Sequence, residues 1–164
     1  FVIFGASFIR RPLIDHLVER RALNLHMGTS PYYRGTACNF WALYDGKPGY
    51  VGATIHLLTE GLDSGPMLCH AMPGPEDARG LDGFALGMRA VRVGINVLVS
   101  LVSDSRWRDL QAVAQDRSME IRYTRNRDFT DQVAADYLSN APSVEAIEAA
   151  IENRDSSRFM ALSG

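Results

Sequence analysis

The chain of 164 residues is 46% hydrophobic and 22% charged, and its 17 basic and 19 acidic side chains leave a formal net charge of -2. This composition is typical of one globular domain and argues against a disordered chain. The near-zero charge disfavours a nucleic-acid-binding module, which needs a basic surface to hold phosphates. Two cysteines, Cys38 and Cys69, cannot form a disulfide framework or a zinc-finger spacing, so we expect a reducing, cytoplasmic setting.

Strands and helices are expected to alternate along the first third of the chain. The apolar run at residues 1–4 stops at Gly5 and predicts a fully buried strand. The spacing of apolar residues predicts a short helix over 12–18, and alternation predicts a second strand over 22–26. A loop rich in Gly, Pro, Ser and Tyr is expected at residues 27–36.

The same alternation continues in the next segment. We expect a helix over 40–44, a strand with alternating faces over 50–58, a tight loop over 61–66 and a short strand over 67–72. Strands interleaved with helices in this way predict an α/β sheet.

A long helix is expected in the middle of the chain, because apolar residues recur there at helical spacing. Polar residues interrupt its most apolar part, at 91–102, which is therefore too short to span a membrane. The chain also lacks the positively charged start of a signal peptide. Near the C-terminus, Ser143 is expected to cap a second helix built on Val144, Ile147 and Ile151. The stripe of the long helix consists of Phe84, Met88, Val91, Ile95, Leu98 and Val102.

Two polar side chains lie near the C-terminal end of the second predicted strand. Asn24 and His26 are two residues apart, so they project from the same face. Polar groups at a strand end beside a loop mark ligand sites in open α/β sheets. An imidazole can titrate near neutral pH, and a carboxamide can donate a hydrogen bond to a developing oxyanion. On its own, however, the pair is better explained as a buried histidine and a strand-ending asparagine.

Two loops carry further candidates. Asp63 lies between Gly61 and Gly65, where an aspartate alone is an ordinary turn residue, although a carboxylate is also the usual partner of a working histidine. The segment 31–35 by itself indicates only a surface loop with exposed tyrosines.

Taken together, four motifs form a specific series. They are Asn24-Leu25-His26, Ser30-Pro31-Tyr32-Tyr33-Arg34-Gly35, Gly52-Ala53-Thr54-Ile55-His56 and Leu62-Asp63-Ser64-Gly65-Pro66. From Phe1 to about Leu68 the chain closely resembles the folate-dependent formyltransferases, which include methionyl-tRNA formyltransferase, glycinamide ribonucleotide transformylase and the sugar N-formyltransferases. The resemblance implies a Rossmann-like α/β domain with a mostly parallel sheet flanked by helices. Residues 1–117 would be the C-terminal part of that catalytic domain, and residues 118–164 an extension of unknown role.

The resemblance also implies a site. Asn24, His26 and Asp63 stand at the positions of the family's catalytic Asn, His and Asp. The formyl donor would be N10-formyltetrahydrofolate, and no metal is required. The residues at the positions of the family's folate pocket are Phe8, Ile9, Arg10, Gly61 and Leu62.

The chain departs from the family in two places. Met27-Gly28-Thr29-Ser30-Pro31 replaces the usual Pro-Ser-Leu-Leu-Pro after the histidine, which bears on loop shape and substrate preference. The opening strands of the domain, which contribute much of the acceptor site, are absent. We therefore expect either a longer protein upstream or an acceptor site that is built differently.

The expected reaction is transfer of the formyl group to a primary amine of a small molecule such as a nucleotide-linked amino sugar. A near-neutral chain suits such an acceptor better than a tRNA. Asn24 and protonated His26 would stabilise the oxyanion, while Asp63 would raise the pKa of His26 and assist proton transfer. The alternatives are a formyltetrahydrofolate hydrolase and a non-catalytic folate- or partner-binding remnant. A homodimer stays open, and no membrane partner is expected.

The other candidate residues are expected to be structural. His56 would support the site rather than catalyse, and no group of residues has a metal-ligand spacing. The remaining expectations are that His16 and His70 have no partner, that Cys38 and Cys69 act as small apolar residues, that Phe40, Trp41 and Tyr44 belong to the core, and that Arg122, Arg125 and Arg127 form a solvated run.

Overall fold

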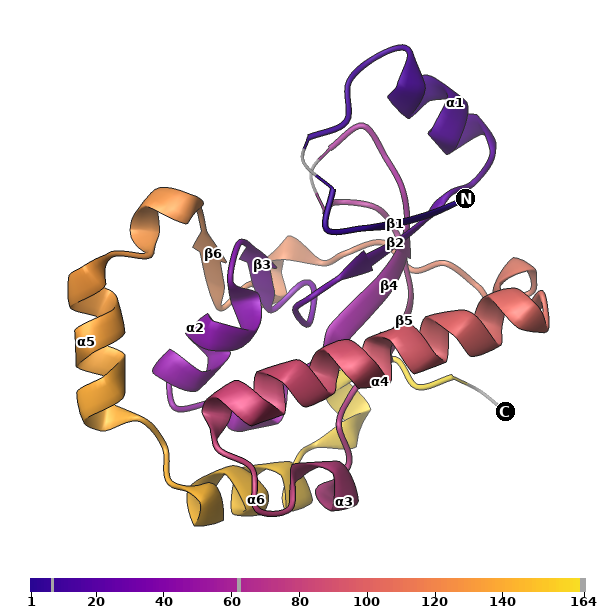
Figure 1. Ribbon diagram of the computed structural model, residues 1–164. Coiled ribbons are helices and arrows are strands. Elements are labelled where there is room, and N and C mark those ends of the chain that lie inside the picture. Colours follow the sequence, from indigo (N-terminus) through magenta and orange to yellow (C-terminus); the bar gives the residue numbers. More distant parts are fainter. Residues whose placement is uncertain (7, 62, 163–164) are drawn as a thin grey trace.

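A four-stranded sheet forms the centre of the computed structural model, which describes residues 1–6, 8–61 and 63–162 (Figure 1). The strands β1 and β2 run parallel, whereas β2 with β4 and β4 with β5 run antiparallel. The α/β class is confirmed, but the sheet is mixed rather than mostly parallel. A nine-residue connection from β4 to β5 is too short for a parallel crossover. The sheet order is β1 (Val2–Phe4), β2 (Leu23–His26), β4 (Ala53–Leu57) and β5 (Met67–Ala71).

Helices are present at the four predicted segments, whereas two further helices, at residues 75–78 and 131–140, were not predicted. The N-cap Ser143 accepts a hydrogen bond at Oγ from the amide of Ala146, as expected. A two-stranded parallel ladder of β3 (Tyr33–Gly35) and β6 (Arg122–Thr124) was not predicted, because three residues are too few to show alternation. The helices are α1 (Leu13–Glu19), α2 (Cys38–Tyr44), α3 (Pro75–Ala78), α4 (Gly83–Ser103), α5 (Asp131–Asn140) and α6 (Val144–Glu152). The 3-10 turns are Pro48–Tyr50, Arg106–Arg108, Arg117–Met119, Asn126–Asp128 and Ser156–Arg158.

One face of the sheet is apolar and packs against α4 (Figure 1). The helix comes closest at Gly94, where a Cβ atom would lie 3.0 Å from the Ala53 Cβ and 3.2 Å from the Leu25 Cδ1. A larger residue at this position would push the helix away from the sheet. The buried cluster comprises Leu23, Leu25, Ala53, Ile55, Leu68, Cys69, Ala71, Leu98 and Leu101.

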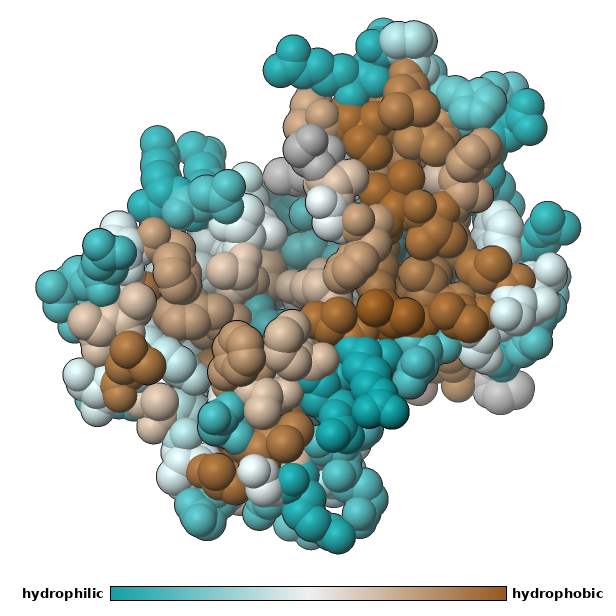
Figure 2. All heavy atoms as spheres, viewed as in Figure 1, coloured by the Kyte–Doolittle hydropathy of each residue, from teal (hydrophilic) through white to brown (hydrophobic). Residues whose placement is uncertain are grey.

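The apolar stripe predicted for α4 faces mostly outward. Phe84 is 78% exposed, while Leu86 is fully buried, and Leu98 is the one stripe residue in the core. Small residues let the helix approach the sheet, so the larger apolar side chains lie on its other side and form a brown band in Figure 2. The buried residues of α4 are Gly83, Leu86, Ala90, Gly94, Leu98 and Leu101.

The first strand is confirmed, but its predicted burial is wrong. Val2 and Phe4 are exposed and Ile3 is half-buried. The reason is position: β1 lies at the edge of the described sheet, and α4 packs on β2, β4 and β5 instead.

A second core joins α2 to the C-terminal segment. Ile147 and Ile151 of α6 are buried in it together with Trp41. Arg122, expected in a solvated run, instead donates two hydrogen bonds to the Asp45 carboxylate and lies 4.8 Å from the centre of the Trp41 ring. The domain boundary near residue 117 stays a prediction.

By length and composition, α4 could cross a membrane, because its most apolar 18-residue window has a mean hydropathy of 1.6. The core helix of a soluble protein can pass the same test, so this is weak evidence for a membrane span. In this structure α4 packs on the sheet and buries 28% of that window.

Candidate active site

The second face of the sheet carries buried polar side chains. The antiparallel register places Asn24 opposite His56, and Thr54 opposite both His26 and His70. Residues paired across neighbouring strands point to the same face, so three strands present five polar side chains together. His26, Thr54, His56 and His70 are each at most 7% exposed. Such burial is costly unless every polar group has a partner.

Asp63 reaches this face from the loop between β4 and β5. The loop folds back tightly over β4, because Gly65 lies where any Cβ atom would overlap the carbonyl oxygen of Leu57. Gln115, far along the chain, donates through Nε2 to the carbonyl oxygens of Asp63, at 2.8 Å, and of Gly65, at 2.9 Å. The loop is thus held by its own glycine and by a distant amide that sequence reasoning missed.

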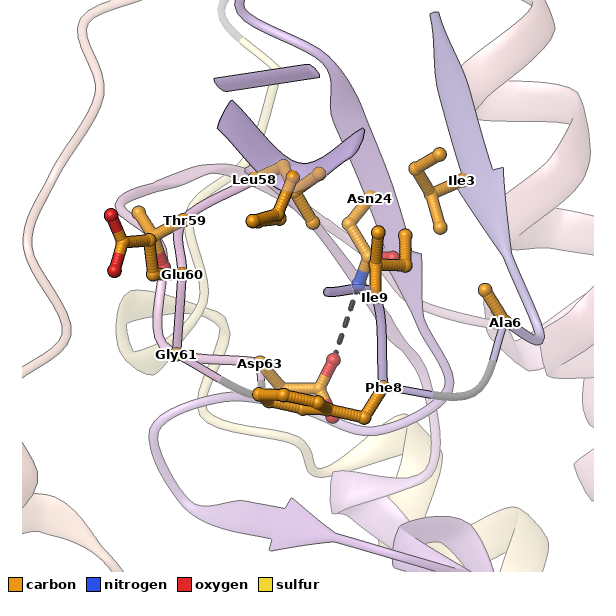
Figure 3. A pocket seen from close by; sticks show the side chains of 11 residues that line it. Ile3, Ala6, Phe8, Ile9, Asn24, Leu58, Thr59, Glu60, Gly61 and Asp63 are labelled. Atoms are coloured by element: carbon orange, nitrogen blue, oxygen red, sulfur yellow. Dashed lines mark hydrogen bonds between the residues drawn. The ribbon is translucent and has the colours of Figure 1, made fainter. Parts of the chain in front are cut away.

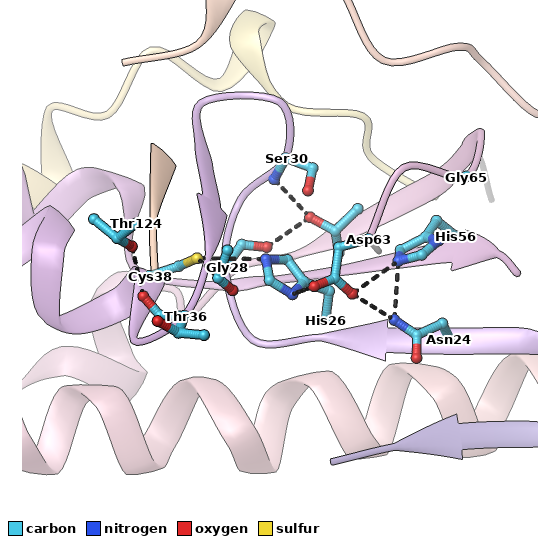
Figure 4. Close-up of polar contacts among 12 residues, drawn as sticks. Asn24, His26, Gly28, Ser30, Thr36, Cys38, His56, Asp63, Gly65 and Thr124 are labelled. Carbon is cyan, nitrogen blue, oxygen red and sulfur yellow. Dashed lines mark hydrogen bonds and ion pairs between the residues drawn. The ribbon is translucent and has the colours of Figure 1, made fainter. Parts of the chain in front are cut away.

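The amide of Asn24 is held by two acceptors. Its Nδ2 atom lies 2.9 Å from His56 Nε2 and 3.2 Å from Asp63 Oδ1 (Figure 4). His56 Nδ1 lies 2.9 Å from the carbonyl oxygen of Leu57, so Nδ1 carries the proton and Nε2 accepts from Asn24. His56 therefore supports the site by orienting Asn24, as expected.

His26 is enclosed on both edges of its ring. Its Nδ1 lies 3.4 Å from Asp63 Oδ2, and its Nε2 lies 3.5 Å from the sulfur of Cys38. The structure therefore brings Asn24, His26 and Asp63 together from two separate segments.

The titration of His26 differs from the sequence expectation. Burial lowers the pKa of His26 below its usual value, and the opposing effect of Asp63 does not overcome it. For Asp63, partial burial alone would raise the pKa, but His56, His26 and the Asn24 amide together lower it. Without bound substrate, the site therefore holds a neutral imidazole beside a carboxylate.

A shallow pocket of about 50 Å³ opens beside this cluster (Figure 3). Asn24 and Asp63 form its polar end, and the candidate cofactor residues Phe8, Ile9 and Gly61 line the rest. Arg10 is exposed and does not line the pocket, and Leu62 lies outside the described residues.

An apolar wall with a polar end suits a flat aromatic group that carries a polar substituent. The small volume, compared with roughly 300–1,000 Å³ for ligand pockets, leaves room for only part of such a ligand. In the described part of the chain, no three His, Cys, Asp or Glu side chains are grouped so as to hold a metal ion.

Two further residues have partners that the sequence did not reveal. His70, expected to have no partner, donates from Nε2 to the carbonyl of Ser30 at 2.6 Å and accepts from the amide of Met160 at 2.9 Å. Cys38 is buried as expected, but its sulfur contacts His26. No local pattern marks these contacts, because the partners lie 12 to 90 residues away.

A large part of the chain is similar to known proteins. A family model described as formyl transferase matches residues 3–74. Methionyl-tRNA formyltransferase from Synechococcus sp. (strain JA-3-3Ab) is 29% identical over 119 residues, which are 72% of this chain and 36% of that protein. The enzyme from Thermosynechococcus vestitus is 48% identical over 68 residues, 42% of this chain and 20% of its own length. The chain thus spans about a third or less of these relatives.

Solved formyltransferases share the fold. PseJ from Anoxybacillus kamchatkensis, solved with UDP-4,6-dideoxy-4-formamido-L-AltNAc and tetrahydrofolate, has a TM-score of 0.64 at 19% identity, over 94% of this chain and 77% of that one. Methionyl-tRNA formyltransferase from Clostridium thermocellum has a TM-score of 0.51 at 15% identity, over 83% and 60%. At such identities the likeness concerns the Rossmann-like fold alone. Over residues 3–74 the chain is thus similar to the formyl transferase family.

Proposed function

We propose that the chain carries the catalytic centre of an enzyme that transfers a formyl group from N10-formyltetrahydrofolate to a primary amine of a small molecule. One observation carries the proposal: Asp63 meets Asn24 Nδ2 at 3.2 Å and His26 Nδ1 at 3.4 Å beside an open pocket. A carboxamide can stabilise the tetrahedral oxyanion of formyl transfer, and an imidazole with a carboxylate can move its protons.

Asn24 would hold the developing oxyanion. Its Nδ2 group already donates to His56 and, through the longer bond, to Asp63. An oxyanion formed in the pocket would replace Asp63 as the second acceptor, while His56 keeps the amide oriented. One such donor contributes about 2.7–4 kcal/mol to lowering the barrier.

Asp63 would connect His26 to the reacting groups. It lines the pocket, whereas His26 does not, so protons reach the imidazole past the carboxylate. Neutral His26 can take up the proton that the attacking amine releases, and its positive charge then stabilises the oxyanion. General acid–base help of this kind contributes about 10²–10⁴-fold.

Phe8 and Ile9 would form the wall against which the flat ring of the folate lies. Both line the pocket, and Phe8 is exposed at its mouth. PseJ, solved with tetrahydrofolate, and a Helicobacter canadensis N-formyltransferase, solved with folinic acid, support a folate as the donor.

A nucleotide-linked amino sugar is the acceptor we propose. The PseJ complex contains a UDP-linked formamido sugar, and the Helicobacter canadensis structure contains dTDP-3-aminofucose. The sequence relatives are methionyl-tRNA formyltransferases, which makes methionyl-tRNA the competing acceptor. The net charge of -2 favours the smaller one.

The test is a product assay with N10-formyltetrahydrofolate and each acceptor in turn: UDP- and dTDP-linked amino sugars, methionyl-tRNA, or water alone. We expect a formamido sugar and tetrahydrofolate in equal amounts. His26→Ala and Asp63→Ala should abolish turnover with little loss of folate binding by calorimetry, while Asp116→Asn, at an exposed carboxylate, should not.

Other outcomes would replace the proposal. Formyl release without any amine would indicate a hydrolase, and formylation of methionyl-tRNA would change the acceptor. Folate binding without formyl loss would indicate a binding protein, and equal turnover in wild type and the two alanine variants would refute the site.

A further inference from the structure

Cys38 and His26 are in contact and are both buried. Cys38 is the first residue of α2 and is 2% exposed. Its sulfur lies 3.5 Å from His26 Nε2 and 3.6 Å from the carbonyl oxygen of Gly35. Gly28 packs against both side chains, and a Cβ atom there would lie 2.9 Å from His26 Nε2. The Nε2 edge of the catalytic imidazole is therefore sealed, with a thiol as its hydrogen-bonding partner.

A thiol has one proton and can also accept a hydrogen bond. The thiol donates to the carbonyl of Gly35, so its sulfur can accept a hydrogen bond from Nε2–H. When His26 is neutral, this bond holds its proton on Nε2 and leaves Nδ1, facing Asp63, free to take up a proton. When His26 is cationic, Nε2 keeps the same partner, which an apolar residue at position 38 could not provide.

We propose that Cys38 is a positioning residue for His26, whose sulfur accepts from Nε2–H while its own proton is directed to the carbonyl of Gly35, so that the ring gains and loses a proton only at Nδ1, on the side of Asp63. The inference rests on the catalytic role proposed for His26. No bond to sulfur forms, and the thiol keeps its proton throughout.

The surroundings are consistent with this arrangement. Burial raises the pKa of Cys38 to about 12, so the thiol remains protonated at neutral pH. The charged or titratable groups that face His26 are Asp63 from the loop, His56 from β4, Arg34 from β3 and Cys38 from α2. Asp63 is the group opposite Cys38, on the Nδ1 edge.

The first experiment uses the wild-type protein labelled with ¹⁵N-histidine, with NMR of the imidazole nitrogens across pH. We expect neutral His26 to carry its proton on Nε2, where the sulfur accepts it, and neutral His70 to carry it on Nε2, as its two backbone bonds require. A neutral His26 protonated on Nδ1 would overturn the proposal, because the nitrogen that faces Asp63 could then take up no further proton.

The second experiment compares Cys38→Val, which keeps the volume but removes the hydrogen bonds, with Cys38→Ser, which keeps both donor and acceptor. Cys38→Val should lower the pKa of His26 by about half a unit or more, because the cation loses a charge-assisted bond and the neutral ring a weaker one. Cys38→Ser should restore most of the shift. Equal titration in all three proteins would refute the role of the thiol.

Cys69→Val is the matched control. Cys69 is also fully buried and its pKa is also raised to about 12, but it packs in the apolar cluster against α4. This variant should leave the His26 titration unchanged. A His26 shift as large as that of Cys38→Val would mean that packing, not hydrogen bonding, is responsible.

Activity separates this inference from the proposed function. Cys38→Val should lower kcat about tenfold, the equivalent of one hydrogen bond, with a smaller change in KM, and Cys38→Ser should recover it. A wild-type protein without formyl transfer would end the proposed function, and the imidazole measurements would still decide the role of Cys38.

Discussion

His26 and His70 lie on the same face of the sheet and are equally buried, yet their partners differ in kind. Both nitrogens of His70 bond to backbone groups, the carbonyl of Ser30 and the amide of Met160. Both nitrogens of His26 face side chains, Asp63 and Cys38. Burial lowers the pKa of both histidines, so neither burial nor the direction of the shift separates them.

The chemistry of the partners does separate them. Backbone groups cannot change their proton count, so His70 is locked in one neutral tautomer and ties the loop after β2 to the C-terminal segment. A carboxylate and a thiol can each follow a change in protonation. The comparison teaches that a catalytic histidine has side-chain partners that tolerate a change in its protonation. A structural histidine has both nitrogens bonded to backbone groups, which fix it in one protonation state.

The largest effect on turnover is expected when His26, the histidine with side-chain partners, is replaced. His26→Asn should lower turnover about 10³-fold, within the range for loss of a general acid or base, while the thermal midpoint changes little. Steady-state assays and calorimetry measure the two quantities. Turnover within a few-fold of wild type would break the comparison.

The second largest loss of turnover is expected from a variant that displaces Asp63. Gly65→Ala forces a Cβ atom into the Leu57 carbonyl, and a shift of the loop by about 1 Å can cost about 10²-fold in turnover. The matched control is Gly87→Ala on α4, where a Cβ meets nothing within 4 Å and alanine favours the helix by up to about 1 kcal/mol. Full activity in the Gly65→Ala variant would show that the loop is not held as described.

Replacing His70, whose nitrogens both bond to backbone groups, should lower stability rather than turnover. His70→Ala leaves the Ser30 carbonyl and the Met160 amide without their partner, which should cost about 1–3 kcal/mol of unfolding free energy. Urea unfolding measures this loss, and turnover at low temperature should fall far less than in His26→Asn. Unchanged stability would contradict the structural role.

The smallest effect concerns pH. Because both folded-state pKa values are lowered, the unfolded chain binds more protons, and stability should fall as pH drops below about 6.5. Each histidine adds at most about 1.4 kcal/mol per pH unit to that slope. His70→Asn should flatten the slope between pH 7 and 5 in urea unfolding. A slope identical to that of wild type would show that His70 titrates normally in the fold.

Local patterns were sufficient for most helices and strands. The alternation at 22–26 and the cap at Ser143 correspond to β2 and α6, because both signals depend on neighbouring residues. The buried face of α4 could not be predicted in this way. The apolar pattern pointed to Phe84 and Met88, but packing buries Ala90 in the core around α2 and Gly94 against the sheet.

The sequence by itself determined the α/β class and the motif series that carries Asn24, His26 and Asp63, because residue type and spacing along the chain suffice for both. Only the tertiary structure decided what those side chains touch. Three sets of contacts join segments that are distant in the chain: the hydrogen bonds of Gln115 to the Asp63 loop, the Cys38 thiol at His26, and the backbone bonds of His70. The burial that lowers the pKa of His26 likewise arises only when such segments pack together.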